Sequence, residues 1–467
     1  MFTLNLSRSR KDGGTLVEQI VSSIEQELRH GTFAAGTALP SVRGLAKQHG
    51  LSAYTVAEAY QRLVSLGLIA SRPGAGYRVA TVAADAPAAP VWNAPTLNAA
   101  WLLSDVFADQ SIPIKAGCGW IPNDWINESG LQHALRTVSR TPGARIGGYG
   151  HPYGLASLRE YIGASLRRYS LAVGSADVLL TEGATQALDL IVRTLLTPGD
   201  TVVVEDPCYC NLLQILKLAF VNVVSVPRTA EGIDSARLEA VIAEHRPKGI
   251  FINTVLQNPS GSSLSVSSAF RLLQIADRTG LWVVEDDISR ELALPGAPCL
   301  AAMEGLQRVI YVSGFSKTIT PAARVGYIAA NRKLIAKLAL TKMAVGLTSS
   351  EITERTVANV LIEGHYDRHV EHIRERLFNA HKRVTDSMHR AGLEIFHEPN
   401  AGLFLWAKLP IRAEESLAVT TQALARGIWL APGSYFRPDE TMSPWFRFNA
   451  ATSDVPDLWK FVRTLSK

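Results

Sequence analysis

Beyond about residue 112, this 467-residue chain alternates short apolar runs with stretches of helical periodicity. The runs are rich in Val and Ile and have the length of buried strands: VLLTEG, TVVVEDP, NVVSVP, GIFINTV, LWVVEDD and VIYVSG. Strands that are apolar on both faces and separated by helices are typical of a mainly parallel sheet covered by helices. The alternation therefore predicts a large α/β domain.

The last hundred residues change in character. A helical pattern runs from about residue 350 to residue 391, and the segments GLFLWAKLP and WFRFNAA that follow it are strand-like. We interpret this region as a small C-terminal α+β lobe of the same domain, which then covers residues 112–467.

The first 80 residues are organised differently. Apolar residues recur every four positions in a first helix over about residues 14–30, and two short helices follow, which begin at Ser41 and Ser52 and end at glycines. Two short helices joined by a tight turn form a helix-turn-helix, and LIASRPGAGYRVA adds a hairpin around a Gly- and Pro-rich turn. We therefore expect a winged helix-turn-helix over residues 1–80.

Between these two regions the composition shifts to Ala, Pro and Asp, as in TVAADAPAAPVWNAP. The stretch has no helical or strand period, which favours a linker over residues 81–111. The alternative is an irregular loop inside a single domain, but structureless insertions of that length are unusual.

Positive charge is concentrated near the N-terminus. Residues 1–80 contain nine Lys and Arg against five Asp and Glu, and the formal net charge of the whole chain is +5. A basic surface fits contact with phosphates, although a surplus of this size also occurs on ordinary solvated faces.

The composition argues against several other classes. No stretch of about 18 uninterrupted apolar residues is present, and the N-terminus MFTLNLSRSR lacks the apolar segment of a secretory signal. We therefore expect a soluble cytoplasmic protein with no membrane contact. The four cysteines form no C-x-x-C pair, so we expect reduced thiols and no metal site.

The string SGFSKTITPAARVGY has the most informative chemistry. Lys317 follows a strand amid small and hydroxyl residues, and Arg324 lies seven positions further on. A lysine held in a pocket can bond covalently to an aldehyde cofactor, and an arginine nearby can clamp a phosphate through two hydrogen bonds. Taken alone, such a pair is usually a pair of surface residues, so the interpretation depends on the other motifs.

Those motifs lie at the ends of other predicted strands. Asp286 closes LWVVEDD, where an α/β fold places ligand contacts, and its carboxylate could hold a pyridinium nitrogen protonated. Asn258 follows GIFINTV. Ala184 and Thr185 open a helix whose N-terminus can bind a phosphate, and Tyr209, after TVVVEDP, can stack on a flat ring.

With these motifs in this order, residues 112–467 resemble the fold-type I pyridoxal-phosphate aminotransferases. The resemblance rests on YG at Tyr149, GATQAL, EDPCY, QNPSG, VVEDD, SGFSK with its later arginine, and FRFNAA. It implies pyridoxal 5'-phosphate as cofactor, held by the positions that match Lys317, Asp286, Asn258, Tyr209, Thr185, Ser316 and Arg324. It also implies that Arg447 binds the α-carboxylate of a substrate or effector, and that Tyr149 reaches the phosphate in the neighbouring subunit.

The string ALPSVRGLAKQHGLSAYTVAEAYQRLVSLGLIASRPGAGYRV closely resembles the winged helix-turn-helix of GntR-type bacterial repressors. The resemblance implies phosphate contacts at the second helix, major-groove contacts at the third and a backbone or minor-groove contact from the wing. The residues concerned are Ser41 and Arg43, then Ser52, Tyr54 and Thr55, and finally Arg72. Alternatively, the two serines are only helix caps and Arg43 belongs to an internal salt bridge.

The fusion of these two modules resembles the MocR subfamily of GntR regulators. It implies a homodimer that binds double-stranded DNA and responds to pyridoxal phosphate or to a small amino acid or amine.

Two residues or positions depart from the family pattern. The third helix has Ala53 where many GntR proteins have Arg, and Ile288 and Ser289 occupy positions where relatives carry a tyrosine. Loss of that phenol weakens the case for efficient transamination.

The leading hypothesis is therefore a ligand-responsive transcription regulator with at most vestigial transaminase activity. The alternative is a working pyridoxal-phosphate-dependent aminotransferase with an appended DNA-binding module. A constitutive DNA-binding scaffold with a dead cofactor domain is disfavoured, because the residues needed to hold the cofactor are all present.

Overall fold

The computed structural model describes residues 15–29, 33, 36–72, 76–80, 112–141 and 147–465. Contacts within the chain divide it into two compact units, Met1–Ala94 and Pro95–Lys467. The expected linker over residues 81–111 and the tip of the expected wing, residues 73–75, lie outside the described residues.

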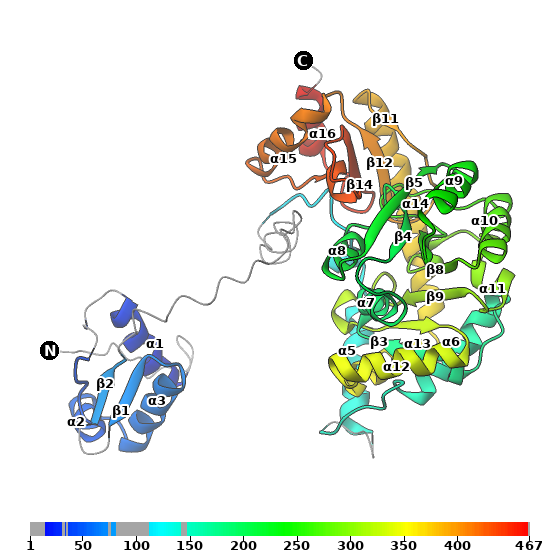
Figure 1. The fold of residues 1–467 in the computed structure, drawn as a ribbon. Coiled ribbons are helices and arrows are strands. Elements are labelled where there is room, and N and C mark those ends of the chain that lie inside the picture. The colour runs from blue at the N-terminus through cyan, green and yellow to red at the C-terminus, as the bar shows by residue number, and fades with distance from the viewer. Residues whose placement is uncertain are drawn as a thin grey trace. The chain divides into compact units, whose positions relative to one another are not determined.

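The described part of the first unit has three helices followed by an antiparallel hairpin, as predicted (Figure 1). The elements are α1 Leu16–Arg29, α2 Val42–His49, α3 Ala53–Ser65, β1 Ile69–Arg72 and β2 Gly76–Val79. Ile20 and Ile24 of α1 are fully buried against Leu45, Tyr60 and Leu63, so the four-residue period marks the face that packs on the other helices.

Local hydrogen bonds set the ends of the two short helices. The side-chain oxygen of Ser41 accepts a bond from the N–H of Gly44 at 3.0 Å, and that of Ser52 accepts one from the N–H of Thr55 at 3.0 Å. Gly50 ends α2 in the left-handed conformation, with φ +62°. Both serines are therefore N-caps. Gly50 ends α2, because a residue without a Cβ adopts the left-handed conformation without strain.

An eight-stranded sheet forms the centre of the second unit, in the order β3-β10-β9-β8-β7-β4-β5-β6. Its strands are β3 Val178–Thr181, β4 Thr201–Asp206, β5 Asn222–Thr229, β6 Gly232–Ile233, β7 Gly249–Asn253, β8 Trp282–Asp286, β9 Val309–Gly314 and β10 Gly326–Ala329. β10 pairs antiparallel with β3 and β9, and β6 pairs antiparallel with β5, while the four other strand pairs are parallel, so the prediction of a mainly parallel sheet is confirmed. The strands β10 and β6 were not among the predicted strands.

Helices cover both faces of this sheet (Figure 1). One face packs against α6 Ala156–Leu166, α9 Ser235–His245, α10 Val266–Thr279, α11 Leu300–Glu304 and α13 Glu351–Ile362, with α5 Glu128–Arg140 beside α13. The other face packs against α7 Gly183–Leu195, α8 Cys210–Leu218 and α12 Arg332–Gly346. Side chains alternate along β8, with Val283 in the first core and Val284 in the second. Alternation places Asp286 on the α7 and α8 side.

The C-terminal lobe has an antiparallel sheet in the order β11-β12-β14-β13. Its elements are α14 Tyr366–Arg390, β11 Glu394–Ile395, β12 Phe404–Lys408, α15 Ser416–Leu424, β13 Ala431–Pro432, β14 Trp445–Asn449 and α16 Pro456–Thr464. The expected α+β lobe is confirmed. The single helical run expected over 350–391 is wrong in one respect: α13 ends at Ile362 and α14 begins at Tyr366, because Gly364 adopts φ +75° between them.

The first described residues of the second unit also belong to this lobe. Ile114 pairs with Ile428 in a parallel bridge, and Ala116 is fully buried in the core of the lobe. The lobe is thus built from both ends of the domain. Within the part of the chain that the structure describes, no helix is both long enough and apolar enough to span a bilayer.

Candidate functional site

Lys317 lies just after β9, beyond the end of the parallel strands. Its ammonium donates a hydrogen bond to the carbonyl oxygen of Gly119, 198 residues earlier in the chain. The pKa of Lys317 is lowered from 10.5 to about 8, first because the amine is desolvated and second because Arg447 is positively charged. Arg324 acts in the same direction and Asp286 opposes it. Near neutral pH the neutral, nucleophilic fraction of this amine is therefore much larger than that of an ordinary lysine.

The N-terminus of α7 and the guanidinium of Arg324 lie next to each other. Gly183 opens the helix with φ +81°, and a Cβ at this position would lie 2.8 Å from Nη2 of Arg324. That nitrogen also donates to the carbonyl of Glu182 at 3.1 Å. Ala184 and Thr185 complete the first helical turn. Backbone N–H groups at a helix N-terminus beside a guanidinium form a site that fits a phosphate.

Asp286 ends β8 on the same side of the sheet. Burial raises the pKa of its carboxyl to about 6, against hydrogen bonds that lower it. The N–H of Ile288 donates to Oδ1 at 3.4 Å, and the side chain of Asn253 donates to the backbone carbonyl of Asp286 at 2.9 Å. At neutral pH the carboxyl is mainly ionised, so it can accept a hydrogen bond from a protonated ring nitrogen.

Arg447, in β14, is 4% exposed and lies between two aromatic rings. Its guanidinium carbon is 4.8 Å from the ring centroid of Phe404 and 4.7 Å from that of Phe436. Nε and Nη2 donate to the carbonyl of Gly117 at 3.2 and 2.7 Å, and Nη1 donates to Oδ1 of Asn258 at 2.8 Å. Of the five guanidinium N–H groups, one on each Nη is left over. This pair matches the two oxygens of a carboxylate.

Tyr209 precedes α8 and lies close to Thr185. The pKa of the Tyr209 phenol is raised to about 12, mainly by burial, and hydrogen bonds with Thr185 and Asn211 oppose the shift. The negative charge of Asp286 is also close enough to raise it. The aromatic side chain, the α7 terminus and the β8 carboxylate therefore surround one site.

The two remaining expected cofactor residues are Ser316 and Tyr149. Ser316 is half-buried next to Lys317. Tyr149 is 76% exposed in the single chain. Its loop lies against the segment after α12, where a Cβ on Gly150 would be 2.8 Å from the carbonyl of Ser349.

Some residues around the site gave no sequence signal. Gly117 and Gly119 contribute only their backbone carbonyls, which any residue has. Asn253 was also missed, although it ends β7, so the rule that singled out Asp286 could have found it. Ile288 packs among the apolar side chains near α7, and Ser289 is 8% exposed, so neither position supplies the absent phenol.

A second buried polar cluster lies around the end of β8. The ligand atoms of Glu285, Asp287 and Cys299 are within 4.8 Å of one another. Nε of Arg290 is 2.5 Å from Oδ2 of Asp287, and its Nη2 is 3.8 Å from Oε1 of Glu285. Both oxygens of Glu285 also accept N–H groups from the first turn of α11. The cluster is therefore a buried ion-pair network that joins β8 to α11.

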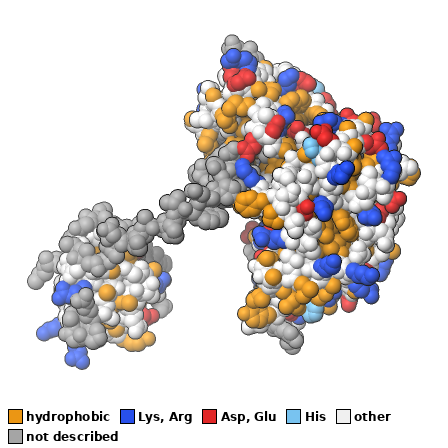
Figure 2. All heavy atoms as spheres, viewed as in Figure 1, with side chains coloured by type: hydrophobic (Ala, Val, Ile, Leu, Met, Phe, Trp, Pro, Cys, Tyr) orange, Lys and Arg blue, Asp and Glu red, His pale blue; other side chains and the backbone are white. Residues whose placement is uncertain are grey.

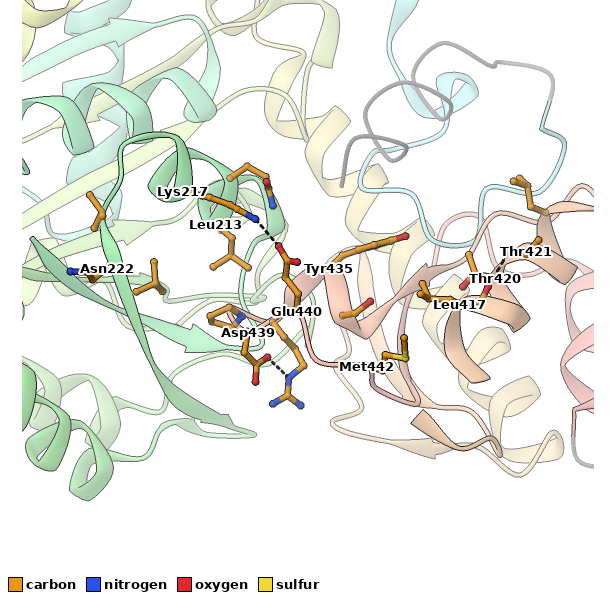
Figure 3. Close-up of a pocket in the computed structure, with 17 residues that line it drawn as sticks. Leu213, Lys217, Asn222, Leu417, Thr420, Thr421, Tyr435, Asp439, Glu440 and Met442 are labelled. Atoms are coloured by element: carbon orange, nitrogen blue, oxygen red, sulfur yellow. Dashed lines mark hydrogen bonds and ion pairs between the residues drawn. The ribbon is translucent and has the colours of Figure 1, made fainter. Parts of the chain in front are cut away.

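A groove of about 1060 Å³ lies between α8 and the segment around α15 of the lobe (Figure 3). Inside it, Nζ of Lys217 is 3.2 Å from Oε1 of Glu440, and Nε of Arg437 is 3.4 Å from Oδ1 of Asp439. None of the residues that line the groove is one of the expected cofactor residues. The groove is therefore not part of the Lys317 site.

In the first unit, the residues expected at DNA lie where the short helices begin. Ser41 and Ser52 are the N-caps, and Oγ of Ser52 is 2.8 Å from Oγ1 of Thr55. Tyr54, the second residue of α3, is 77% exposed. A large aromatic residue in this position is available to an external surface.

Arg43 is the second residue of α2 and is exposed. Arg72 closes β1, and its side chain lies outside the described residues. Lys and Arg side chains project from the described surface of this unit (Figure 2).

Family comparisons agree with this geometry. Residues 127–465 match the model of aminotransferase class I and II, and residues 16–79 match that of the gntR family of bacterial regulatory proteins. The chain therefore belongs to the aminotransferase class I and II family and carries a gntR-type DNA-binding domain at its N-terminus. Among gntR regulators, this combination of domains is that of the MocR type.

The relatives include full-length regulators and free-standing enzymes. YdcR of Escherichia coli, an uncharacterized HTH-type transcriptional regulator, is 30% identical over 93% of this chain and 94% of its own length. The probable rhizopine catabolism regulatory protein MocR of Rhizobium meliloti is 29% identical over 89% and 85%. The structure of LysN, an α-aminoadipate aminotransferase from Thermus thermophilus, has a TM-score of 0.71 and 26% identity, and the match covers 78% of this chain and 93% of LysN.

The cofactor of the class I and II aminotransferases is pyridoxal 5'-phosphate, and the site has the donor set for it. Gly183 and Arg324 form a cradle that a Cβ would fill, which suits the phosphate. Asp286 suits the ring nitrogen, and the amine of Lys317, with its lowered pKa, suits the aldehyde.

Proposed function

We propose that this protein is a transcription regulator that binds double-stranded promoter DNA through its first unit and senses a small amino acid or amine at the pyridoxal-phosphate site of its second unit. The observation that carries the proposal is the convergence of Lys317, Asp286, Arg324 and Arg447 on one site in a chain that also has an exposed helix-turn-helix. The proposed arrangement is residues 1–80 for DNA, a linker over 81–111 and residues 112–467 for the ligand, acting in the cytoplasm.

Each residue of the site has a proposed task. Pyridoxal phosphate supplies an aldehyde that captures amines and a ring that withdraws electrons. Lys317 anchors it covalently, Asp286 keeps the ring nitrogen protonated and Tyr209 covers the ring. The phosphate is held by Ala184, Thr185, Ser316 and Arg324, and Asn258 holds Arg447 in place. Arg447 then binds the carboxylate of the effector through its remaining pair of N–H groups.

The same site supports a second candidate function, a working aminotransferase, because LysN shares its fold. The residues after Asp286 favour the regulator. Ile288 is apolar and Ser289 carries only a short hydroxyl, so no phenol from either position controls the protonation of the ring oxygen. We therefore propose that turnover is slow.

A homodimer is the proposed assembly. The end of α12 exposes apolar side chains that include Leu340, Met343 and Val345, at 69, 41 and 49%. The loop of Tyr149 lies against Ser349, just beyond this helix. Burial of this apolar surface by a second copy would bring Tyr149 to the partner, as the family resemblance implies.

Two assays on the purified full-length protein test the proposal. In a mobility-shift assay, the protein should retard DNA from its own promoter and not a scrambled control. In the second, the cofactor-loaded protein should turn over common amino donors slowly or not at all. Rapid transamination without preference for the promoter DNA would establish the aminotransferase instead.

A further inference from the structure

Residues 115–120, here called the strap, connect the linker region to the effector site. Every one of its six carbonyl groups accepts a hydrogen bond. Five carbonyls bond to groups in β14 or in the turn after it, and only Gly119 bonds to the large α/β part, through Lys317. A short segment with all its carbonyls paired is held in one position.

One side of the strap holds the arginine. The carbonyl of Gly117 accepts bonds from Nε and Nη2 of Arg447, and its N–H donates to the carbonyl of Trp429 at 2.9 Å. A Cβ at Gly117 would lie only 2.4 Å from the nitrogen of Ala431, so the strap approaches β13 as closely as a backbone can. The position of Gly117 thus decides where the free N–H pair of Arg447 points.

Asn449 ties the strap to the lobe. It is fully buried, and its Nδ2 donates to the carbonyls of Cys118 and Trp120 at 3.1 and 2.7 Å. Its backbone N–H donates to the carbonyl of Ala116 at 2.6 Å, and its Oδ1 accepts the N–H of Ala451 at 2.9 Å. Asn449 follows Arg447 by two residues on the same strand, so one strand holds both the effector residue and the strap.

The other end of the strap follows the first described residues of the second unit. Oγ1 of Thr452 donates to the carbonyl of Lys115 at 2.8 Å. Ile112, three residues before, is buried with Trp429, and residue 111 is the last of the expected linker. The strap is therefore the piece of chain that lies between the effector arginine and the covalent path to the DNA-binding unit.

We infer that the strap transmits the binding of a carboxylate at Arg447 to the linker. Asn449 is the positioning residue that couples Arg447 to the strap. The inference rests on the proposed function, because it needs an effector carboxylate at Arg447. If the position of the strap sets the N–H pair that binds the carboxylate, then a bound carboxylate stabilises that position of the strap by the same free energy. Ligand binding then fixes the chain at the point where the linker ends.

Hydrogen-exchange mass spectrometry on the full-length protein loaded with pyridoxal phosphate tests this. The probes are the twenty proteinogenic L-amino acids, added singly, with the cofactor absorbance reporting which of them bind. An amino acid that changes the absorbance should slow exchange in the peptide over 112–121, and should change the affinity for promoter DNA measured by fluorescence anisotropy.

Two variants separate coupling from binding. Thr452→Val keeps the shape of the side chain and removes the hydroxyl that bonds to Lys115, so the midpoint of the absorbance titration should stay and the change in DNA affinity should shrink. Asn449→Ala removes the two side-chain bonds to the strap and the bond from Ala451, so the midpoint should rise about fivefold and the DNA response should be lost. Asn359→Ala, on α13 and away from the strap, is the matched control and should behave as the wild type.

The outcomes are distinct. The strap mechanism is wrong if the absorbance changes without protection of residues 112–121, or if the DNA response survives in both Thr452→Val and Asn449→Ala. Either result would leave the proposed function intact. No absorbance change with any of the twenty amino acids would overturn the proposed effector class, and the strap mechanism with it. Protection in the wild type together with a lost response in Asn449→Ala supports the inference.

Discussion

The guanidinium of Arg447 donates two hydrogen bonds to the carbonyl oxygen of Gly117, a residue 330 positions earlier in the chain. The same guanidinium is held on another side by Asn258, and it lies between the rings of Phe404 and Phe436. These contacts fix its orientation before any ligand arrives, which reduces the entropy lost when a carboxylate binds.

Replacement of Arg447 by lysine should weaken amino-acid binding without loss of the cofactor. Lysine keeps the positive charge but has only three N–H donors and no planar fork, so it cannot keep the three bonds to Gly117 and Asn258 and also bind both oxygens of a carboxylate. The loss of about 2 kcal/mol for a charge-assisted bond corresponds to a roughly thirtyfold higher midpoint in the absorbance titration. An unchanged midpoint would remove Arg447 from the effector site.

The reactivity of Lys317 should rise with pH through about 8. Its pKa is lowered from 10.5 to about 8 by desolvation and by the charge of Arg447, and only the neutral amine is nucleophilic. The neutral fraction is thus small at pH 6, half at about pH 8 and nearly complete at pH 10. Competitive acetylation of the cofactor-stripped protein, read by mass spectrometry with exposed Lys460 as internal reference, measures the midpoint. A midpoint near pH 10 would contradict the desolvated site.

Gly183→Ala should impair cofactor retention more than it impairs folding. The φ of +81° strains any residue with a Cβ, and here the Cβ would also meet Arg324 at 2.8 Å. We expect the affinity for pyridoxal phosphate, measured by fluorescence titration, to fall by about tenfold or more.

The matched control for that variant is Gly199→Ala. Gly199 has φ +88°, but nothing lies within 4 Å of its Cβ position. Both variants should lose about 1–2 kcal/mol of unfolding free energy in urea, from the same backbone strain. Equal cofactor affinities in the two variants would show that the α7 terminus is not the phosphate cradle.

Arg43→Ala should weaken DNA binding and leave the cofactor absorbance intact. Arg43 is exposed near the start of α2, where the family resemblance places a phosphate contact, so its replacement should remove a contact with DNA. The expected loss is roughly 1–3 kcal/mol, with a shallower dependence on salt, because one phosphate contact disappears. Fluorescence anisotropy at several salt concentrations measures both. Arg412→Ala, an exposed arginine of the C-terminal lobe, is the control and should bind DNA as the wild type does.

Lys317→Ala should remove the covalent cofactor bond. Borohydride treatment of the cofactor-loaded wild type should fix the cofactor on the peptide that contains Lys317, and the variant should show no such adduct. An adduct on a different lysine of the wild type would place the anchor elsewhere.

Much of the fold and of the site could be predicted from the sequence, because both depend on local patterns. The period of four in α1, the serine caps of α2 and α3 and the apolar runs of the parallel strands each involve neighbours in the chain. The residues at the strand ends could be grouped without coordinates, because parallel strands end at the same edge of a sheet. Lys317 and Asp286 were found by this rule.

The tertiary structure alone decided the contacts that depend on distant backbone. The break at Gly364, the strand β10 between β3 and β9, and the place of residues 114–121 in the C-terminal lobe have no periodic signature. The backbone carbonyls of Gly117 and Gly119 are chemically the same as all other backbone carbonyls. The residue type therefore does not indicate that they bond to Arg447 and Lys317. Their role comes from the packing that brings the two ends of the domain together, because a backbone acceptor acquires a specific function only through its position in the fold.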